Sequence, residues 1–151
     1  MNKRYSWAVG RKAETLVHDM MKELGFKVVQ FGYEYLLPDF ANKKNLLKGP
    51  AGKVIRSQPD FVIVDPKDNH AYFIEVKYRK DGEISEKSIG DYPENYIVLV
   101  SPKGLRIAKW EYMVKNKEKY CFKLLTEIGP FKDKDKTTIM KYVELAKKSF
   151  Y

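Results

Sequence analysis

Apolar positions in the first part of the chain follow a helical spacing and then become a continuous run. Between residues 6 and 24 they recur at intervals of three and four, the pattern of a one-sided helix: Ala13, Leu16, Val17, Met20, Met21 and Leu24. Gly25 follows directly, and glycine is the residue that most often ends a helix. The pattern predicts a helix over 6–24 and a strand over 26–31.

The middle of the chain has the pattern of a β-hairpin. Apolar runs at 61–64 and 71–77 flank a polar segment, 65–70, that contains proline, asparagine and aspartate. The segment before them, 32–58, contains prolines and glycines and predicts a surface loop or an extended hairpin. The run 96–100 predicts a buried strand that could lie parallel to its neighbour, after a crossover with only a weak helical signal.

The last third of the chain has weaker patterns until its end. Residues 105–110 and 120–125 are two further candidate strands, and a C-terminal helix capped by Thr137 or Thr138 follows. Together the elements predict an α/β fold, a mixed central β-sheet flanked by helices with a C-terminal extension. The length of 151 residues fits a single domain, with a core over about 6–110 and a helical extension over about 111–151.

The composition favours a packed protein with an anionic partner. Hydrophobic residues make up 44% of the chain, and 29 basic residues against 20 acidic ones give a net charge of +9. Such a surplus is typical of nucleic-acid binders, although many lysine-rich proteins are merely soluble. No apolar stretch is long enough to span a bilayer, and the N-terminus lacks a leader pattern, so we expect a soluble cytoplasmic protein without a membrane partner.

Cysteine and histidine give little sign of catalysis. Cys121 is the only cysteine and lies in an apolar run, which favours a small buried side chain over a nucleophile. His18 and His70 are far apart in the sequence and have no zinc-site spacing around them. We expect neither histidine to be catalytic.

Three charged residues flank the predicted hairpin and carry the strongest functional signal. Glu75 and Lys77 lie two positions apart on one strand, so their side chains point to the same face. If Val64 pairs with Ala71, Asp60 falls opposite Glu75, with Cβ atoms about 4.5–5.5 Å apart. The register predicts that two carboxylates and an ammonium group converge at one end of an apolar hairpin.

Two adjacent carboxylates repel each other unless a cation joins them. Mg²⁺ prefers oxygen ligands, polarises phosphoryl oxygens and lowers the pKa of bound water. Lys77 could then orient the attacking water or stabilise the transition state. The alternative is a solvated strand face, on which a glutamate and a lysine two positions apart are common; against it, both residues follow the apolar run at 72–74.

The stretches at 58–64 and 72–80, Gln-Pro-Asp-Phe-Val-Ile-Val and Tyr-Phe-Ile-Glu-Val-Lys-Tyr-Arg-Lys, resemble the PD-(D/E)xK, or restriction-endonuclease-like, nucleases. Within that superfamily the chain looks most like archaeal Holliday-junction resolvases, which share a glutamate-bearing helix followed by Gly-Phe and a valine-rich strand. The resemblance covers about 8–31 and 56–100. The segment 32–57 is longer and more basic than the resolvase pattern, the helix after the Glu-x-Lys strand is short or missing, and the region after 103 is extra.

The resemblance implies roles for named residues. Asp60 and Glu75 would be metal ligands, Val76 would lend its carbonyl, Lys77 would be the catalytic lysine, and Glu14 would be a further acidic residue of the metal site. The less favoured alternative is that Glu14 is an ordinary surface glutamate. The metal would be Mg²⁺ or Mn²⁺, the product would carry a 5′ phosphate, and the enzyme would act as a homodimer on DNA, including branched DNA. Basic residues near these segments would contact phosphates: Arg11, Lys12, Arg56, Arg79 and Lys80.

Three functional hypotheses follow from the sequence. The first is an active metal-dependent endonuclease of DNA repair or recombination, Holliday-junction resolvase-like or of another kind. The second is a non-catalytic nucleic-acid-binding protein that retains the nuclease fold. The third is an unrelated basic scaffold in which the motif is accidental. The presence of Asp60, Glu75 and Lys77 together favours the first.

Overall fold

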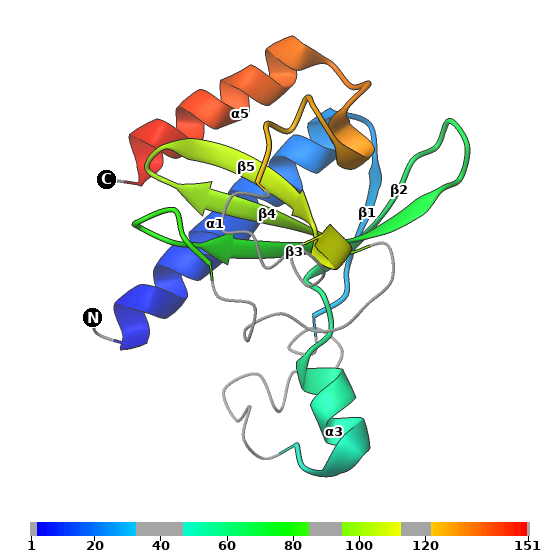
Figure 1. Cartoon of the computed structure of the whole chain (residues 1–151), viewed down its shortest axis with the longest axis vertical. Helices are drawn as coiled ribbons and strands as arrows, with labels where there is room; N and C mark the ends of the chain where they lie inside the picture. The colour runs from blue at the N-terminus through cyan, green and yellow to red at the C-terminus, as the bar shows by residue number, and fades with distance from the viewer. Residues whose placement is uncertain (1–2, 33–46, 85–94, 113–121, 151) are drawn as a thin grey trace.

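The computed structural model describes residues 3–32, 47–84, 95–112 and 122–150. Its helices and strands follow the predicted order in outline (Figure 1). They are α1 (Lys3–Glu23), β1 (Lys27–Gln30), α3 (Gly49–Arg56), β2 (Phe61–Val64), β3 (Ala71–Tyr78), β4 (Asn95–Ser101), β5 (Gly104–Lys109), the short 3₁₀ helix η4 (Gly129–Phe131) and α5 (Lys136–Ser149). No helix in these ranges is long and apolar enough to cross a membrane.

The five strands form one mixed sheet in sequential order, β1-β2-β3-β4-β5. Strands β3 and β4 run parallel, and the other three neighbouring pairs are antiparallel. The α/β class with a mixed central sheet is therefore confirmed. The parallel placement of β4 is confirmed as well, and it agrees with the complete burial of that strand, which is typical of parallel strands.

The hairpin has the register that the sequence predicts. Val64 pairs with Ala71 and Val62 pairs with Phe73. At the tip, Asp65 and Asp68 accept hydrogen bonds from main-chain N–H groups two residues ahead, and Asn69 adopts a φ of 58°. The turn thus fixes which residues of the two strands face each other at the far end, where Asp60 enters.

Helices α1 and α5 pack side by side on one face of the sheet (Figure 1). Their apolar residues join those of the strands in one core, which includes Val17, Met20, Ile74, Ile139 and Ala146. The other face carries a smaller cluster of Ile97 and Ala108, with Ile84, Trp110 and Phe122 packed against it. The C-terminal region is therefore part of the same core as the strands.

One prediction for the segment 32–58 is wrong where the structure describes it. Residues 49–56 form helix α3, which projects away from the sheet (Figure 1). Proline at the first turn does not disturb a helix because that N–H has no helical partner, and Pro50 occupies such a position. Gly52 allows a close approach, since a Cβ atom there would lie 2.7 Å from the carbonyl carbon of Leu47. Residues 33–46 lie outside the described ranges.

Two expectations for the C-terminal third also change. Asp135, not Thr137 or Thr138, caps α5: its carboxylate accepts from the Thr137 N–H, and Thr138 Oγ1 donates to it at 2.7 Å. Aspartate is a stronger N-cap than threonine, which explains the shift. Within 122–125 there is a single bridge, between Ile107 and Lys123, and no strand. Cys121 lies outside the described residues.

Candidate active site

The alternation of strand β3 places Glu75 and Lys77 together. Ile74 and Val76 point into the core on the side of α1, so Glu75 and Lys77 point to the opposite face. Lys77 Nζ lies 3.1 Å from Glu75 Oε1. The two side chains are only 22% and 13% exposed, so the pair is more than a solvated strand face.

Asp60 joins this pair through the end of strand β2. Its main-chain oxygen accepts hydrogen bonds from the N–H groups of Phe31 and Gly32, which fixes it beside the end of β1. Its carboxylate Oδ2 accepts from the N–H of Val76 at 2.7 Å. The side chain thereby continues the hydrogen bonding of β2 along β3, and its carboxyl lies against the main chain between Glu75 and Lys77. The structure brings these three predicted residues together.

The Asp60 carboxyl has an unusual electrostatic environment. Desolvation is the largest cause that raises its pKa well above the ordinary value, and the charges of Glu75 and Glu14 raise it further. The Val76 N–H and the Lys77 ammonium lower this pKa but do not offset the rise. Asp60 keeps part of its surface exposed, while its carboxyl group has lost most of its hydration. The Asp60 carboxyl is therefore poorly solvated and lies within the electrostatic influence of two other acidic side chains.

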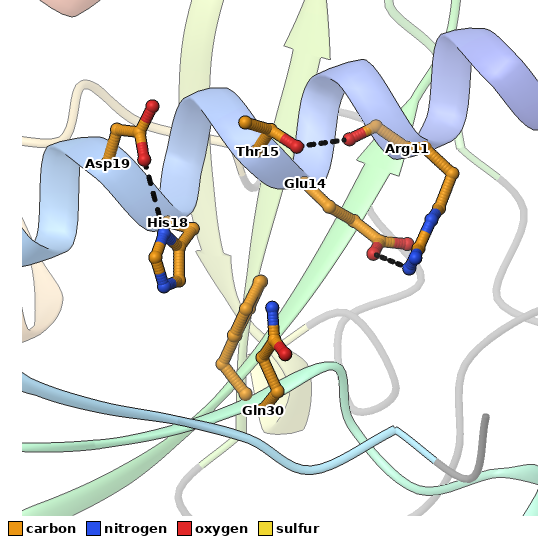
Figure 2. Close-up of a pocket in the computed structure, with 7 residues that line it drawn as sticks. Arg11, Glu14, Thr15, His18, Asp19 and Gln30 are labelled. Carbon is orange, nitrogen blue, oxygen red and sulfur yellow. Dashed lines mark hydrogen bonds and ion pairs between the residues drawn. The ribbon is translucent and has the colours of Figure 1, made fainter. Parts of the chain in front are cut away.

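Glu14, on helix α1, influences Asp60 through its charge. Its side chain is 19% exposed and forms an ion pair with Arg11 Nη1, at 3.4 Å. Both residues line a pocket of about 470 Å³ between α1 and β1, whose other walls are Thr15, His18, Asp19, Gln30 and Phe61 (Figure 2). Asp60, Glu75 and Lys77 are not among the residues that line this pocket.

The main chain of Val76 faces the same place. In a strand, the N–H and C=O of one residue point to the same side. Since the Val76 N–H bonds to Asp60, its carbonyl is directed to the side of Asp60 as well. The carbonyl that the resemblance assigns as a metal ligand therefore points to the side of the strand on which Asp60 lies.

The residues suit a hard divalent cation by their chemistry. Carboxylate and carbonyl oxygens are the ligands that Mg²⁺ prefers, and the mutual repulsion felt by Asp60 is of the kind that a cation relieves. As they stand, however, no three His, Cys, Asp or Glu side chains of the described residues are grouped as a metal site. Lys77 Nζ makes the close contact with Glu75 instead.

The basic residues expected to contact DNA have different surroundings. Arg11 lies beside Glu14, whereas Lys12 points to the end of α5, where Nζ donates to the Ser149 carbonyl and lies over the Phe150 ring. Arg56 bonds within α3, and Arg79 donates to the Tyr78 carbonyl. Lys80 is exposed beside the end of β3. Arg11 alone among these five contacts a residue of the proposed acidic group.

Sequence reasoning missed the pocket and the residues that line it. His18 lies one turn after Glu14 on α1, and its Nδ1 atom contacts Asp19 Oδ1 at 3.2 Å. Figure 2 shows His18 and Gln30 facing each other from α1 and β1. The four-residue spacing from Glu14 to His18 was the available signal, but the partner strand was needed to turn a helix face into a pocket.

Comparisons with protein-family models, with curated proteins and with solved structures found no match for this chain. The assignment of a function therefore depends on the residues and their geometry.

Proposed function

We propose that the chain is a metal-dependent DNA endonuclease of the PD-(D/E)xK type, with Asp60, Glu75 and Lys77 at its centre. The observation that carries this proposal is the hydrogen bond from the Val76 N–H to Asp60, because it holds a desolvated carboxylate between Glu75 and Lys77. The order of α1, β1 and the β2–β3 hairpin, followed by a parallel β4, supports a restriction-endonuclease-like fold.

The cation would be held by Asp60 and Glu75, with the Val76 carbonyl and Glu14 nearby. When bound, Mg²⁺ or Mn²⁺ supplies Lewis-acid polarisation of a phosphoryl oxygen and acidifies a water molecule. The Val76 N–H keeps Asp60 Oδ2 in place, so that the other carboxylate oxygen is directed away from the strand. Without this anchor the charge repulsion among the three carboxyls would move the side chain out of the group.

Lys77 would supply the positive charge that the phosphate needs during hydrolysis. Its ammonium is held beside Glu75 and is mostly shielded from water, which strengthens its attraction for a phosphate oxygen. Arg11 would serve a different purpose, because it pairs with Glu14 and lowers the local negative charge where a DNA strand enters. Lys77 would thus stabilise charge during hydrolysis, and Arg11 would assist the entry of the DNA strand.

The substrate would be DNA, including branched DNA of the kind that junction resolvases cleave. The net charge of +9 favours any polyanion and does not select a DNA structure. By the same resemblance the protein would act as a homodimer, which suits a two-fold junction. The nuclease proposal depends neither on a branched DNA substrate nor on a homodimer.

A cleavage panel tests the proposal. Wild-type protein is incubated with plasmid, single-stranded, flap and four-way-junction DNA, in Mg²⁺, in Mn²⁺ and in EDTA. We expect cleavage that needs the metal. In Lys77→Met the rate should fall by at least about 100-fold, the scale for loss of one charge-stabilising group. Lys67→Met, which removes an exposed lysine in the hairpin turn at the far end from Asp60, is the matched control and should cleave at nearly the wild-type rate.

The other two hypotheses are outcomes of the same panel. Binding to DNA without cleavage in either metal would support a non-catalytic nucleic-acid-binding protein that retains the fold. Neither binding nor cleavage would leave a basic protein of another function. Cleavage that Asp60→Asn and Lys77→Met do not change would also contradict the proposal, because the activity would then come from another site or from a contaminant.

A further inference from the structure

Helix α1 carries an exposed aromatic ring in line with the acidic group. Trp7 is 63% exposed, although tryptophan side chains are highly buried on average. The Arg11 guanidinium lies 5.6 Å from the centre of the Trp7 ring, and its Nη1 lies 3.4 Å from Glu14. A chain of contacts therefore runs from an exposed indole, through a guanidinium, to the carboxylate of Glu14, whose charge acts on Asp60.

Helix geometry aligns Trp7 with Glu14. Seven residues complete two turns to within about 20°, so both residues lie on the same helix face. They are about 10 Å apart along the helix axis, since the rise is about 1.5 Å per residue. Stacked nucleotides of one strand are about 3.4 Å apart, so the indole lies about three nucleotides from the acidic group, and fewer along an extended strand.

We propose that Trp7 stacks on an unpaired base of a nucleic-acid strand whose backbone continues past Arg11 to the acidic group. Stacking on aromatic side chains together with a cationic track is the usual way in which proteins hold single strands. A base inside a duplex has no free face for the indole, because its neighbours cover both sides. The site would thus favour single strands, flaps and the unpaired parts of branched DNA over plain duplex.

A second copy of the chain suits the ring less well. A symmetric contact between two Trp7 rings would bring two Arg11 guanidinium groups together, because each lies against its own indole. Two such cations repel each other, whereas a phosphate of a nucleic-acid strand attracts the Arg11 guanidinium. With a net charge of +9 on the chain, the charges favour the polyanion.

Fluorescence gives a readout of this inference that does not depend on cleavage. The chain contains two tryptophans, and Trp110 packs against the small cluster on the other face of the sheet. A Trp110→Phe protein therefore reports on Trp7 alone. In EDTA, where metal-dependent cleavage cannot occur, we expect saturable quenching of Trp7 by a single-stranded oligonucleotide and by a flap, and little quenching by a blunt duplex of the same sequence.

Affinity measurements on variants make the test quantitative. Trp7→Ala should bind the single strand about fivefold to 150-fold more weakly, the range for one stacked base, and Trp7→Phe should fall between. Tyr5→Ala is the matched control: Tyr5 is 60% exposed on the same helix end but projects about 200° away from Trp7, so affinity should change less than about twofold. When each base of the oligonucleotide is replaced in turn by an abasic site, the quenching of Trp7 should be lost at one position.

The inference rests on the proposed function for its strand path, but it can fail separately. If the proposed nuclease cleaves and Trp7→Ala binds single strands as well as wild type, the stacking site is wrong and the nuclease stands. If Trp7 fluorescence is quenched, and the quenching depends on one base, while no DNA is cleaved, the stacking site stands and the nuclease proposal fails. The stacking site would be overturned if Trp7→Ala lost affinity equally for single strand and duplex. It would also be overturned if the protein were a dimer that Trp7→Ala dissociates.

Discussion

In the absence of metal, Asp60→Asn is expected to raise the melting temperature at neutral pH. The carboxyl of Asp60 is desolvated and faces Glu75 and Glu14, so its ionised form is less stable in the folded protein than in the unfolded chain. Asparagine has the same shape and retains an oxygen that can accept the 2.7 Å hydrogen bond from the Val76 N–H. The substitution therefore removes an unfavourable charge and keeps the main structural contact.

The pH dependence follows from the direction of the pKa shift. The folded-state pKa lies well above the ordinary value of 3.8, so the folded protein holds the proton to higher pH than the unfolded chain. The contribution of Asp60 to stability is fully present below the unfolded pKa and is lost as pH rises through the folded pKa. The loss has a limiting slope of about 1.36 kcal/mol per pH unit. Asp60→Asn lacks this titration.

The expected difference can be measured by thermal unfolding. One kcal/mol corresponds to about 2–4 °C for a protein of this size. The difference in melting temperature between Asp60→Asn and wild type should therefore grow by up to about 3–5 °C for each unit by which the pH rises, and then become constant. Circular dichroism in EDTA between about pH 4 and pH 8 covers this window. Asp65→Asn is the matched control of opposite sign, because Lys134 lowers the pKa of Asp65 and stabilises its charge.

Adding metal extends the same experiment. A cation that binds only the folded protein at 100 times its Kd stabilises it by about 2.7 kcal/mol, so Mg²⁺ should raise the melting temperature of wild type and much less that of Asp60→Asn. The reasoning is refuted if Asp60→Asn melts at or below the wild-type temperature throughout the pH range in EDTA. It is also refuted if Asp65→Asn changes stability in the same direction as Asp60→Asn, since the effect would then be one of net charge.

Two further predictions concern the packing that supports the site. Burial and the hydrogen bond to Glu23 raise the pKa of Tyr142 to about 12, so Glu23→Gln should move its ultraviolet absorbance titration to lower pH and loosen the contact between α1 and α5. Gly129→Ala should destabilise the protein by about 1–3 kcal/mol in urea unfolding, because Gly129 has a φ of 77° and a Cβ atom would lie 2.9 Å from the Tyr96 ring. Unchanged titration or unchanged stability would contradict these two contacts.

Local patterns were sufficient for the hairpin and for its three charged residues. The alternation of β3 determines which side chains share a face, and the polar turn fixes the register, so the meeting of Asp60 with Glu75 and Lys77 could be predicted. The same holds for the end of α1 at Gly25, whose φ of 94° few residues other than glycine adopt. Each of these features depends on residues close in sequence.

Features that depend on distant segments could not be predicted. Helix α3 is an exception, because its close approach of Gly52 to Leu47 is local and yet composition does not reveal it. The place of Lys12 at the end of α5, rather than at the acidic group, follows from the packing of two helices that are more than a hundred residues apart. The pocket between α1 and β1 and the desolvation of Asp60 likewise arise only when α1 lies against the sheet.

The charges at the candidate site explain why a substrate phosphate would need a cation there. Among the described residues, the charges of Glu75 and Glu14 both act on Asp60, while Lys77 contacts Glu75 and Arg11 contacts Glu14. A phosphodiester that approaches this place adds a further negative charge where hydration is poor. Protonation of Asp60 removes one charge but leaves a neutral carboxyl, which cannot bind a metal well. A divalent cation would offset the carboxylate charge without loss of the ligands, so the same desolvation that destabilises the metal-free protein would favour metal and substrate together.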